Sequence, residues 1–455
     1  MEWEKLLNPL RTRELLGGSA SLRASADTRP EFNRDYDRAI FSTAVRRLQD
    51  KAQVFPLERN DFIRTRLTHS LEVSTVARGL ASTVTDELVA KKHVSVEQAE
   101  GIRMIAMTCG LIHDLGNPPF GHAGEEAMRE WFRRTLDDES GLLSALGGPN
   151  SQQTKDFLKF EGNAQTIRIV SRLQMLADHY GLNLTCGTLS AASKYVAKSN
   201  EVSASQHEMT KPGFFASENE VVEKVRSETG TGSARNPIAY LVEASDDIVY
   251  SVVDLEDGIK KRVLDWRAIR DESVLRPLVE KAEQFVEKGK LNLRGHAFEE
   301  AASQFLRTLI IAEHVYAARQ AFVSRYEQIM AGEYHGELMK DSSSWPILDV
   351  CKRLGRMHVY PSQETLRLEL MGRMVIQDLM NCFWEGAKEA PYTADARGFA
   401  VKSYLLLSDS YRVLFERATP VGLPLQYKRL QLVADYVAGM TDSFACSLHE
   451  KLKNG

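Results

Sequence analysis

Ten residues, HDLGNPPFGH at positions 113–122, constrain the fold of this chain more than any other stretch. The apolar run Met104–Ile112 predicts a buried helix that ends in the adjacent imidazole and carboxylate of His113 and Asp114. The glycine, asparagine and two prolines that follow end this helix, and a new helix is predicted to begin near His122. Burying an unpaired carboxylate is costly unless a cation offsets it. The sequence therefore predicts a metal ion here, with further ligands from elsewhere in the chain.

The composition limits the class of protein. The chain has 455 residues, 43% of them hydrophobic and 26% charged, which is enough for one large domain or about two or three smaller ones. The formal net charge of −4 gives no overall polycation that would indicate nucleic-acid binding. The five cysteines are scattered and form no CxxC motif, which argues against a disulfide scaffold and a thiolate zinc site. A polar N-terminus and the lack of an apolar run of about 18 residues predict a cytoplasmic protein without signal peptide or membrane span.

Hydrophobic periods of 3.6 residues recur along the chain and strand patterns are weak, which predicts an all-α fold. Helices are predicted over 35–50, 64–80, 94–112, 164–180, 238–259, 266–288, 298–330, 364–384, 396–416 and 425–449. A short strand or turn is expected in 182–196 and a small hairpin in 357–360.

Three regions are predicted from the changes in sequence texture. Residues 1–32 form an N-terminal arm with a short helix, and 33–265 form the core that carries the site. Within this core, 197–235 is expected to be a long surface loop with a short helix near 218–225. Residues 266–455 form a C-terminal helical region that completes the site and supplies oligomer interfaces.

The helix over 238–259 carries an unusual row of polar residues. Asp246, Tyr250 and Asp254 are spaced by four residues, so they share one face close to the apolar side of the helix. Two explanations are open: the aspartates face solvent, paired with arginine, or Asp246 is a metal ligand. The adjacent His113 and Asp114 earlier in the chain favour the second.

His69 is the candidate for the fourth ligand, although a single histidine on a helix is more often structural. Arg64 and Arg66 precede it, and two guanidinium groups favour the neutral imidazole that binds metal and also suit an anionic substrate. The ligand set His69, His113, Asp114 and Asp246 combines nitrogen and oxygen donors. Such a set suits one divalent ion and leaves positions for water and substrate.

His122 and Glu125, three residues apart at the start of the next helix, form a candidate acid/base pair. A glutamate that orients an imidazole makes it a general acid or a base that positions water. The alternative is that the two side chains only cap the helix and face solvent.

Six motifs in order resemble the bacterial deoxyguanosine triphosphate triphosphohydrolases, a family of HD-domain phosphohydrolases. They are RDYDR (34–38), RRLQDKAQVFPL (46–57), RTRLTHSLEVS (64–74), HDLGNPPFGHAGE (113–125), FEGNAQ (160–165) and DDIVYSVVDLED (246–257). The similarity runs from about residue 30 to 260 and is weaker towards the C-terminus.

The resemblance implies a multi-helix HD core that hydrolyses dNTPs, dGTP favoured, to deoxynucleoside and inorganic triphosphate by attack at the α-phosphorus. It implies that His69, His113, Asp114 and Asp246 are metal ligands, that His122 and Glu125 are catalytic, and that substrate is bound by Gln53, Arg66, Asn117, Lys211, Tyr250 and Asp254. Among these, Arg66 and Lys211 would hold phosphates, while Gln53, Tyr250 and Asp254 would line the deoxyribose. A tyrosine ring pressed against C2′ leaves no room for a ribose hydroxyl.

The cofactor implied is one Mn²⁺ or Mg²⁺ ion per site, with Fe²⁺, Zn²⁺, Co²⁺ or Ni²⁺ as alternatives. The resemblance also implies a homo-oligomer, a hexamer being favoured, and regulation by nucleotide or single-stranded DNA. Two alternatives stay open: a nucleotidase or phosphodiesterase of the HD type that acts on monophosphates or cyclic nucleotides, and a nucleotide- or DNA-binding regulator whose HD site is structural.

Overall fold

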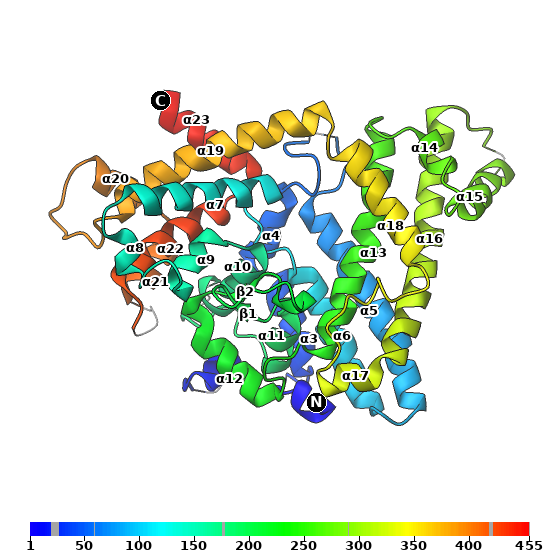
Figure 1. Cartoon of the computed structure of the whole chain (residues 1–455), viewed down its shortest axis with the longest axis horizontal. Helices are drawn as coiled ribbons and strands as arrows, with labels where there is room; N and C mark the ends of the chain where they lie inside the picture. The colour runs from blue at the N-terminus through cyan, green and yellow to red at the C-terminus, as the bar shows by residue number, and fades with distance from the viewer. Residues whose placement is uncertain (20–26, 59, 175–177, 290, 418–421, 455) are drawn as a thin grey trace.

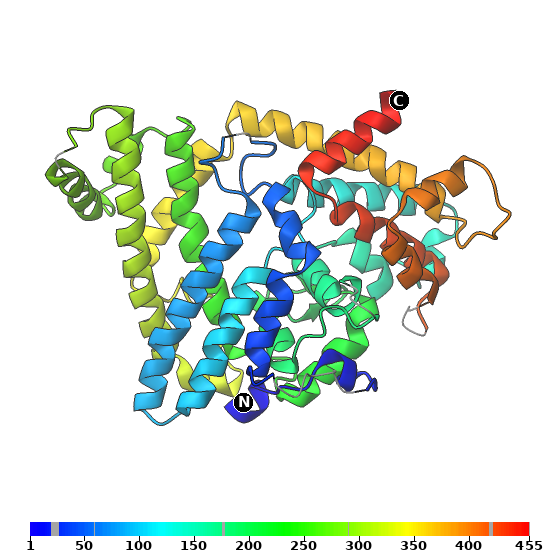
Figure 2. The same ribbon diagram turned by 180° about the vertical axis from the view of Figure 1, so that it is seen from behind.

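The computed structural model describes residues 1–19, 27–58, 60–174, 178–289, 291–417 and 422–454. It is built almost entirely from helices, as predicted, and its one sheet is a parallel pair of very short strands, β1 and β2, among these residues. The two termini lie at opposite edges of the molecule (Figures 1 and 2). None of the helices in the described ranges is long and apolar enough to cross a membrane.

Before the central helix α13, the longest helices are α5, α6 and α7, and shorter elements precede and follow them. The elements of this region are α1 (Trp3–Leu6), α2 (Thr12–Leu15), α3 (Glu31–Ile40), α4 (Thr43–Arg47), η1 (Leu48–Asp50), α5 (Arg66–Ala90), α6 (Val96–Ile112), α7 (Gly121–Asp138), α8 (Leu142–Ala145), α9 (Gln152–Leu158), α10 (Gly162–Arg168), η2 (Ile169–Leu173), α11 (Cys186–Ala192), β1 (Ala197–Lys198), η3 (His207–Met209), β2 (Pro212–Phe214), η4 (Ala216–Glu218) and α12 (Asn219–Thr229).

The C-terminal half begins with α13 and is helical throughout. Its elements are α13 (Pro237–Lys260), α14 (Trp266–Arg270), α15 (Arg276–Lys288), α16 (His296–Ser324), α17 (Tyr326–Ala331), α18 (Trp345–Leu354), η5 (Gly355–Val359), α19 (Gln363–Ala387), α20 (Phe399–Leu406), α21 (Asp409–Arg417), α22 (Leu425–Ala438) and α23 (Asp442–Asn454).

Two large apolar clusters hold the molecule together, and a third joins α13 to α15, α16 and α18. The first packs α7 against α19 and α22, with Trp131 and Phe383 fully buried. The second packs α5, α6, α13 and α16, with Leu80 and Ile105 at its centre. Because α13 takes part in both the second and the third cluster, it passes through the interior of the fold (Figure 1).

Several predicted helices are correct in extent, and several are divided. The helices predicted over 94–112, 238–259 and 364–384 correspond to α6, α13 and α19. The predicted helix 35–50 is broken at Ser42, whose side chain accepts a hydrogen bond from Val45 N and caps α4. The predicted helices 266–288, 298–330, 396–416 and 425–449 are each two helices as well, because helical periodicity continues across a short turn.

Other local predictions are wrong. The predicted hairpin at 357–360 is a π-helical turn, η5, that continues α18. Residues 182–196 hold the helix α11, capped by the Thr185 side chain, where a strand or turn was expected. The predicted helix 164–180 changes to a π-helical turn at Ile169 and ends at Leu173; residues 175–177 lie outside the described ranges.

The segment 197–235 is not the surface loop that the sequence predicts. Its short helix is present as α12, but Phe214, Phe215 and Val221 are buried, and β2 pairs with β1. Its polar composition hides this because the buried run 212–218 is flanked by stretches that are rich in exposed serines and glutamates. The N-terminal arm is also partly packed, since Trp3 and Leu6 are buried. The division into three regions itself stays a prediction.

Candidate active site

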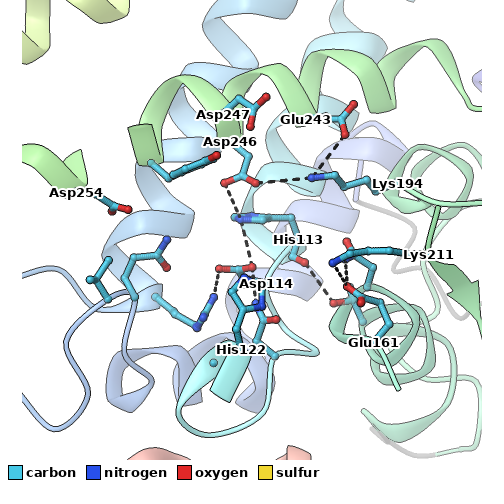
Figure 3. Close-up of a pocket in the computed structure, with 18 of the residues that line it drawn as sticks. His113, Asp114, His122, Glu161, Lys194, Lys211, Glu243, Asp246, Asp247 and Asp254 are labelled. Atoms are coloured by element: carbon cyan, nitrogen blue, oxygen red, sulfur yellow. Dashed lines mark hydrogen bonds and ion pairs between the residues drawn. The ribbon is translucent and has the colours of Figure 1, made fainter. Parts of the chain in front are cut away.

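A cavity of about 670 Å³ lies where α5, the turn between α6 and α7, and α13 meet. Figure 3 shows the side chains that line it. Residues from three distant stretches of the chain close it: Ala52–Pro56, Ala191–Lys211 and Glu337–Glu369 contribute lining side chains. Residues from both halves of the chain therefore line the cavity.

The helix α13 is buried along nearly its whole length and opens only at the cavity. From Pro237 to Ile259 every residue is buried except Asp246 and Tyr250, and both of these line the cavity. Asp254, one turn further on, is buried and also lines it. The alternative in which these aspartates lie on a solvent-facing border of the helix is therefore wrong. The helix presents one polar row to the cavity.

Four side chains from three elements come together beside the cavity. His69 comes from α5, His113 and Asp114 follow α6, and Asp246 comes from α13. The last three line the cavity, whereas His69 is fully buried. Ligand atoms of His69, His113 and Asp114 all lie within 4.8 Å of one another. The Asp246 Oδ1 atom lies 3.1 Å from His69 Nε2 and 3.5 Å from His113 Nε2. Donor atoms that share an octahedral ion at about 2.1 Å lie about 3 Å apart, so this spacing fits one divalent cation.

The hydrogen bonding of His113 fits a metal ligand. Its Nδ1 donates to the Gly110 carbonyl oxygen at 2.7 Å, which leaves the Nε2 lone pair directed into the site. That Nε2 atom is buried and has no hydrogen-bond partner among the described residues. Burial disfavours the charged ring, but Asp114 and Asp246 outweigh it and raise the pKa of His113 to about 9. The four side chains thus attract positive charge, which a metal ion would supply.

Arg66 and Asn117 bind the carboxylate Asp114. The Arg66 guanidinium donates to Oδ2 at 2.6 Å and the Asn117 amide donates to Oδ1 at 2.5 Å. Both were expected to bind substrate; in this structure they orient the carboxylate of a candidate metal ligand, and both also line the cavity. Arg66 packs closely on Gly121, where a Cβ would lie 2.7 Å from the guanidinium and the φ angle is +58°. A side chain at this position would strain the left-handed backbone and displace the Arg66 guanidinium.

His122 and Glu125 lie at the start of α7, and they are paired. The His122 side chain is 87% exposed while that of Glu125 is 3% exposed, with Nδ1 and Oε2 3.4 Å apart. Arg129 and the Gly162 amide also donate to Glu125. Burial opposes the charged form, but these partners, His122 first, lower the pKa of Glu125. A fixed carboxylate therefore holds an imidazole that is free to meet a ligand at the cavity wall.

The side chains expected at the sugar lie on one side of the cavity. Gln53, Tyr250 and Asp254 all line it, together with Tyr360, whose hydroxyl donates to Asp254 Oδ2 at 2.7 Å. Burial raises the pKa of Asp254 to about 7. Gln53 Oε1 and Asp254 Oδ1 are buried acceptors without a partner among the described residues. Two unpaired acceptors in a closed space favour a ligand that brings a hydroxyl donor.

The other side of the cavity carries basic side chains, most of which were not predicted from the sequence. Lys211 was predicted, and its Nζ lies 3.1 Å from Glu161 Oε1. Lys194 was not predicted; its Nζ lies 3.6 Å from Glu243 Oε1 and 4.0 Å from Asp246 Oδ2 (Figure 3). His207 Nε2 lies 2.8 Å from Glu243 Oε1. We call Lys194, His207 and Lys211, with Glu161 and Glu243, the lysine wall.

One arginine, Arg64, and one lysine, Lys352, lie where the sequence did not predict them. Arg64, expected near an anionic substrate, does not line the cavity and instead contacts Asp257 at 2.6 Å and Glu256 at 3.1 Å. Lys352, from α18, does line it; its Nζ lies 2.9 Å from Asp247 Oδ1 and 5.1 Å from the centre of the Tyr250 ring. Neither outcome has a local sequence pattern that would have shown it.

Comparison with known families agrees with this geometry. Residues 66–159 match the HD domain, and residues 347–451 match a phosphohydrolase-associated domain. The first match contains His69, His113, Asp114, His122 and Glu125. HD domains are metal-dependent phosphohydrolases, which is consistent with the cluster of imidazole and carboxylate ligands.

Curated relatives span the whole chain. A deoxyguanosinetriphosphate triphosphohydrolase-like protein of Listeria innocua is 36% identical over 99% of this chain and 99% of its own length. A protein of the same name from Synechocystis is 33% identical over 100% of this chain and 99% of its own length. A deoxyguanosinetriphosphate triphosphohydrolase of Salmonella arizonae is 31% identical over 92% of this chain and 93% of its own length. With its ligand cluster and its HD domain, the chain belongs to the deoxyguanosinetriphosphate triphosphohydrolase family of HD-domain phosphohydrolases.

Proposed function

We propose that this phosphohydrolase converts deoxynucleoside triphosphates, dGTP preferentially, to deoxynucleoside and inorganic triphosphate. The observation that carries the proposal is the arrangement in Figure 3: Asp254, with its unpaired Oδ1, lies on one side, His113, Asp114 and Asp246 lie in the middle, and Lys194 and Lys211 lie on the other side. A dNTP has the matching order of sugar hydroxyl, α-phosphate and terminal phosphates. The relatives' names support the choice of substrate.

In this proposal His69, His113, Asp114 and Asp246 hold one divalent ion, Mn²⁺ or Mg²⁺, which when bound polarises the phosphoryl group and helps to supply the attacking water. Arg66 and Asn117 fix the Asp114 carboxylate, so that ligand keeps its orientation when substrate arrives. Lys194 and Lys211 bind the phosphates beyond the ion.

His122 is the proposed acid/base residue. Hydrolysis at the α-phosphorus adds water to phosphorus and breaks its bond to the 5′ oxygen, which must leave with a proton. An exposed imidazole held by the buried Glu125 can transfer that proton at the phosphate. Removing the pair would leave binding of substrate and metal in place while slowing the chemical step.

Tyr250, Asp254 and Gln53 are proposed to bind the deoxyribose. Asp254 Oδ1 and Gln53 Oε1 accept from the sugar hydroxyl, and the Tyr250 ring packs on the sugar carbons. Packing at C2′ would exclude a ribose hydroxyl, so dNTPs are favoured over NTPs.

Product identification tests the proposal. Each dNTP, and GTP for comparison, is incubated with the protein and Mn²⁺ or Mg²⁺, and the products are separated. The expected products are deoxynucleoside and triphosphate, fastest with dGTP. Pyrophosphate with dNMP, or no turnover of any dNTP, would refute it. Turnover of dNMP alone would favour a nucleotidase, and a salt-dependent shift of single-stranded DNA without hydrolysis would favour a regulator.

We also propose that the protein is a homo-oligomer, with a hexamer favoured, and that its C-terminal helices supply the interfaces. Leu366, Leu370 and Met374 lie four residues apart on α19 and are 45%, 65% and 57% exposed. An exposed apolar row of this kind supports subunit contact. Sedimentation of the protein at two concentrations tests the assembly, and a monomer at both would refute it.

A further inference from the structure

Phe120 is held in a strained backbone conformation next to the proposed acid/base residue. It has φ 62° and ψ 17°, in the left-handed region, and it directly precedes α7, whose second residue is His122. A non-glycine residue in this region is strained and persists only where its surroundings hold it. The contacts that hold Phe120 therefore also determine where α7 begins.

The main polar contact comes from Asp442, at the start of α23. The Phe120 amide donates to its Oδ1 atom at 2.9 Å, and the Ala52 amide donates to its Oδ2 atom at 2.9 Å. The Asp442 residue is 1% exposed. One buried carboxylate thus joins two loops that both reach the cavity, since Ala52 precedes Gln53 in the cavity lining.

A lysine makes the reciprocal connection. Lys51 is buried, and its ammonium donates to the Asn117 carbonyl oxygen at 2.5 Å and to the Ala438 carbonyl oxygen at 2.8 Å. Asn117 and Phe120 lie in the turn between His113 and His122, and Ala438 ends α22. The corner between α22 and α23 is therefore bound to both loops through charged side chains.

The ring of Phe120 is fixed from a second C-terminal element. It packs on Gly372 of α19, where a Cβ atom would lie 2.6 Å from the ring. This contact requires the absence of a side chain at 372. The amide and the ring of the strained residue are thus both held by helices of the phosphohydrolase-associated region.

We propose that Asp442 is a positioning residue: it fixes Phe120 in the left-handed conformation and so sets the place of His122 relative to the metal-ligand side chains. The inference rests on the proposed function for its kinetic consequence, but its structural part does not. It gives the C-terminal helices a specific role in a reaction whose reacting groups come from the HD domain.

The test combines hydrogen exchange with kinetics on Asp442→Ala and Asp442→Asn, with Glu450→Ala as control because Glu450 is an exposed acid on the same helix. In Asp442→Ala, peptides that contain Ala52 and Phe120 should exchange about 10-fold faster or more, while peptides of α13 stay unchanged. Asn retains one acceptor, so Asp442→Asn should give a smaller increase. Bound metal should not change in either variant.

The kinetic prediction is a fall in kcat of about 10–100-fold in Asp442→Ala with little change in KM. If Asp442 acts through His122, the same substitution in a His122→Ala background should cost less than about 3-fold. If Asp442→Ala does not fold, Asp442→Asn and Gly372→Ala carry the same test.

Three results would overturn the inference: unchanged exchange at Ala52 and Phe120, a kcat loss that is equally large without His122, or faster exchange throughout the molecule. Failure of the proposed function is a different outcome. It would appear as no dNTP turnover by the unmodified protein, and the exchange measurement would still decide whether Asp442 holds the two loops.

Discussion

The proposed metal ligands and the lysine wall meet at the same cavity but differ in how their charges are paired. The proposed ligands bring two carboxylates together with two imidazoles; Arg66 already pairs with Asp114, and positively charged neighbours hold the pKa of both aspartates low against the effect of burial. On the lysine wall, Lys194 and Lys211 each have a glutamate within 4 Å, but Arg235 and Arg129 share these two glutamates. The first group therefore carries carboxylates that a bound cation would neutralise further, whereas the second carries more cations than carboxylates before any substrate arrives.

This difference indicates two kinds of preorganisation. The metal-ligand group gains stability from an added ion, so its geometry and its cofactor are linked. The lysine wall holds its cations in place with carboxylates, and a triphosphate must replace or share those partners to bind. Loss of a metal ligand should therefore abolish the chemistry, while loss of a lysine should weaken binding.

The largest effect is expected for Asp246→Ala, which removes a metal ligand from the only open part of α13. Activity should fall more than about 100-fold, and bound metal should be lost with it. Metal analysis and dNTP turnover on the same preparation measure both, with the exposed Glu280→Ala on α15 as control. Retained activity would contradict the ligand assignment.

His122→Ala should lower kcat by about 10²–10⁴-fold while bound metal stays at the level of the unmodified protein. Bound metal should be retained because His122 is 87% exposed and contacts Glu125, not the proposed metal ligands. A variant that loses metal as well as activity would show that the acid/base role and the ligand role are not separate.

Lys194→Ala should lower kcat/KM by about 10–100-fold, mainly through KM, because one charge-assisted contact to a phosphate is lost. Lys198→Ala is the matched control: it lies four residues on, pairs with Glu223 and does not line the cavity. Equal effects of the two substitutions would mean that the lysine wall acts only through overall charge.

The last effect concerns stability and not turnover. Asp156 on α9 accepts hydrogen bonds from Ala216 N, Tyr427 and Ser199. These bonds connect residues 199–216, the segment that carries His207 and Lys211, to α22. Burial raises the pKa of Asp156 to about 7, with these bonds opposing the shift. Because the folded state holds the proton more tightly, this contribution to stability is full below about pH 4 and is lost as the pH rises to about 7.

The free energy of unfolding should therefore fall by up to about 1.4 kcal/mol per pH unit between about pH 4 and 7, relative to Asp156→Asn, which has no such proton. Denaturant unfolding of both proteins across this range measures the difference. Parallel stability curves would mean that Asp156 is ionised in the folded protein.

His69, His113, Asp114 and Asp246 lie close together, as the sequence predicts, because each of them lies in a motif or on a regular helix face. The spacing of Asp246, Tyr250 and Asp254 places them on one row, and the structure has that row facing the cavity. Lys194 and His207 were missed because they lie between short elements, where no periodicity shows direction. Lys352 and Tyr360 were missed because tertiary packing of α18 and η5, which local sequence does not encode, brings them to the cavity.

The predicted fold shows the same limit. Long helices such as α6, α13 and α19 follow directly from their hydrophobic period. The buried segment around Phe214 and Phe215 was predicted as a surface loop, because its apolar residues are few and its partners lie elsewhere in the chain. Its burial depends on long-range contacts, including Asp156 and Tyr427, that a local pattern cannot show.

The contacts of Asp442 have a consequence for how the protein matures during synthesis. Ala52 and Phe120 are translated long before α23, so their amides wait for a partner that arrives only when the last described helix has been made. Contacts of such high sequence separation form late in folding because the intervening chain must first be ordered. If Asp442 positions His122 as proposed, a nascent chain that has not yet made α23 lacks this contact even where its candidate ligand residues have come together.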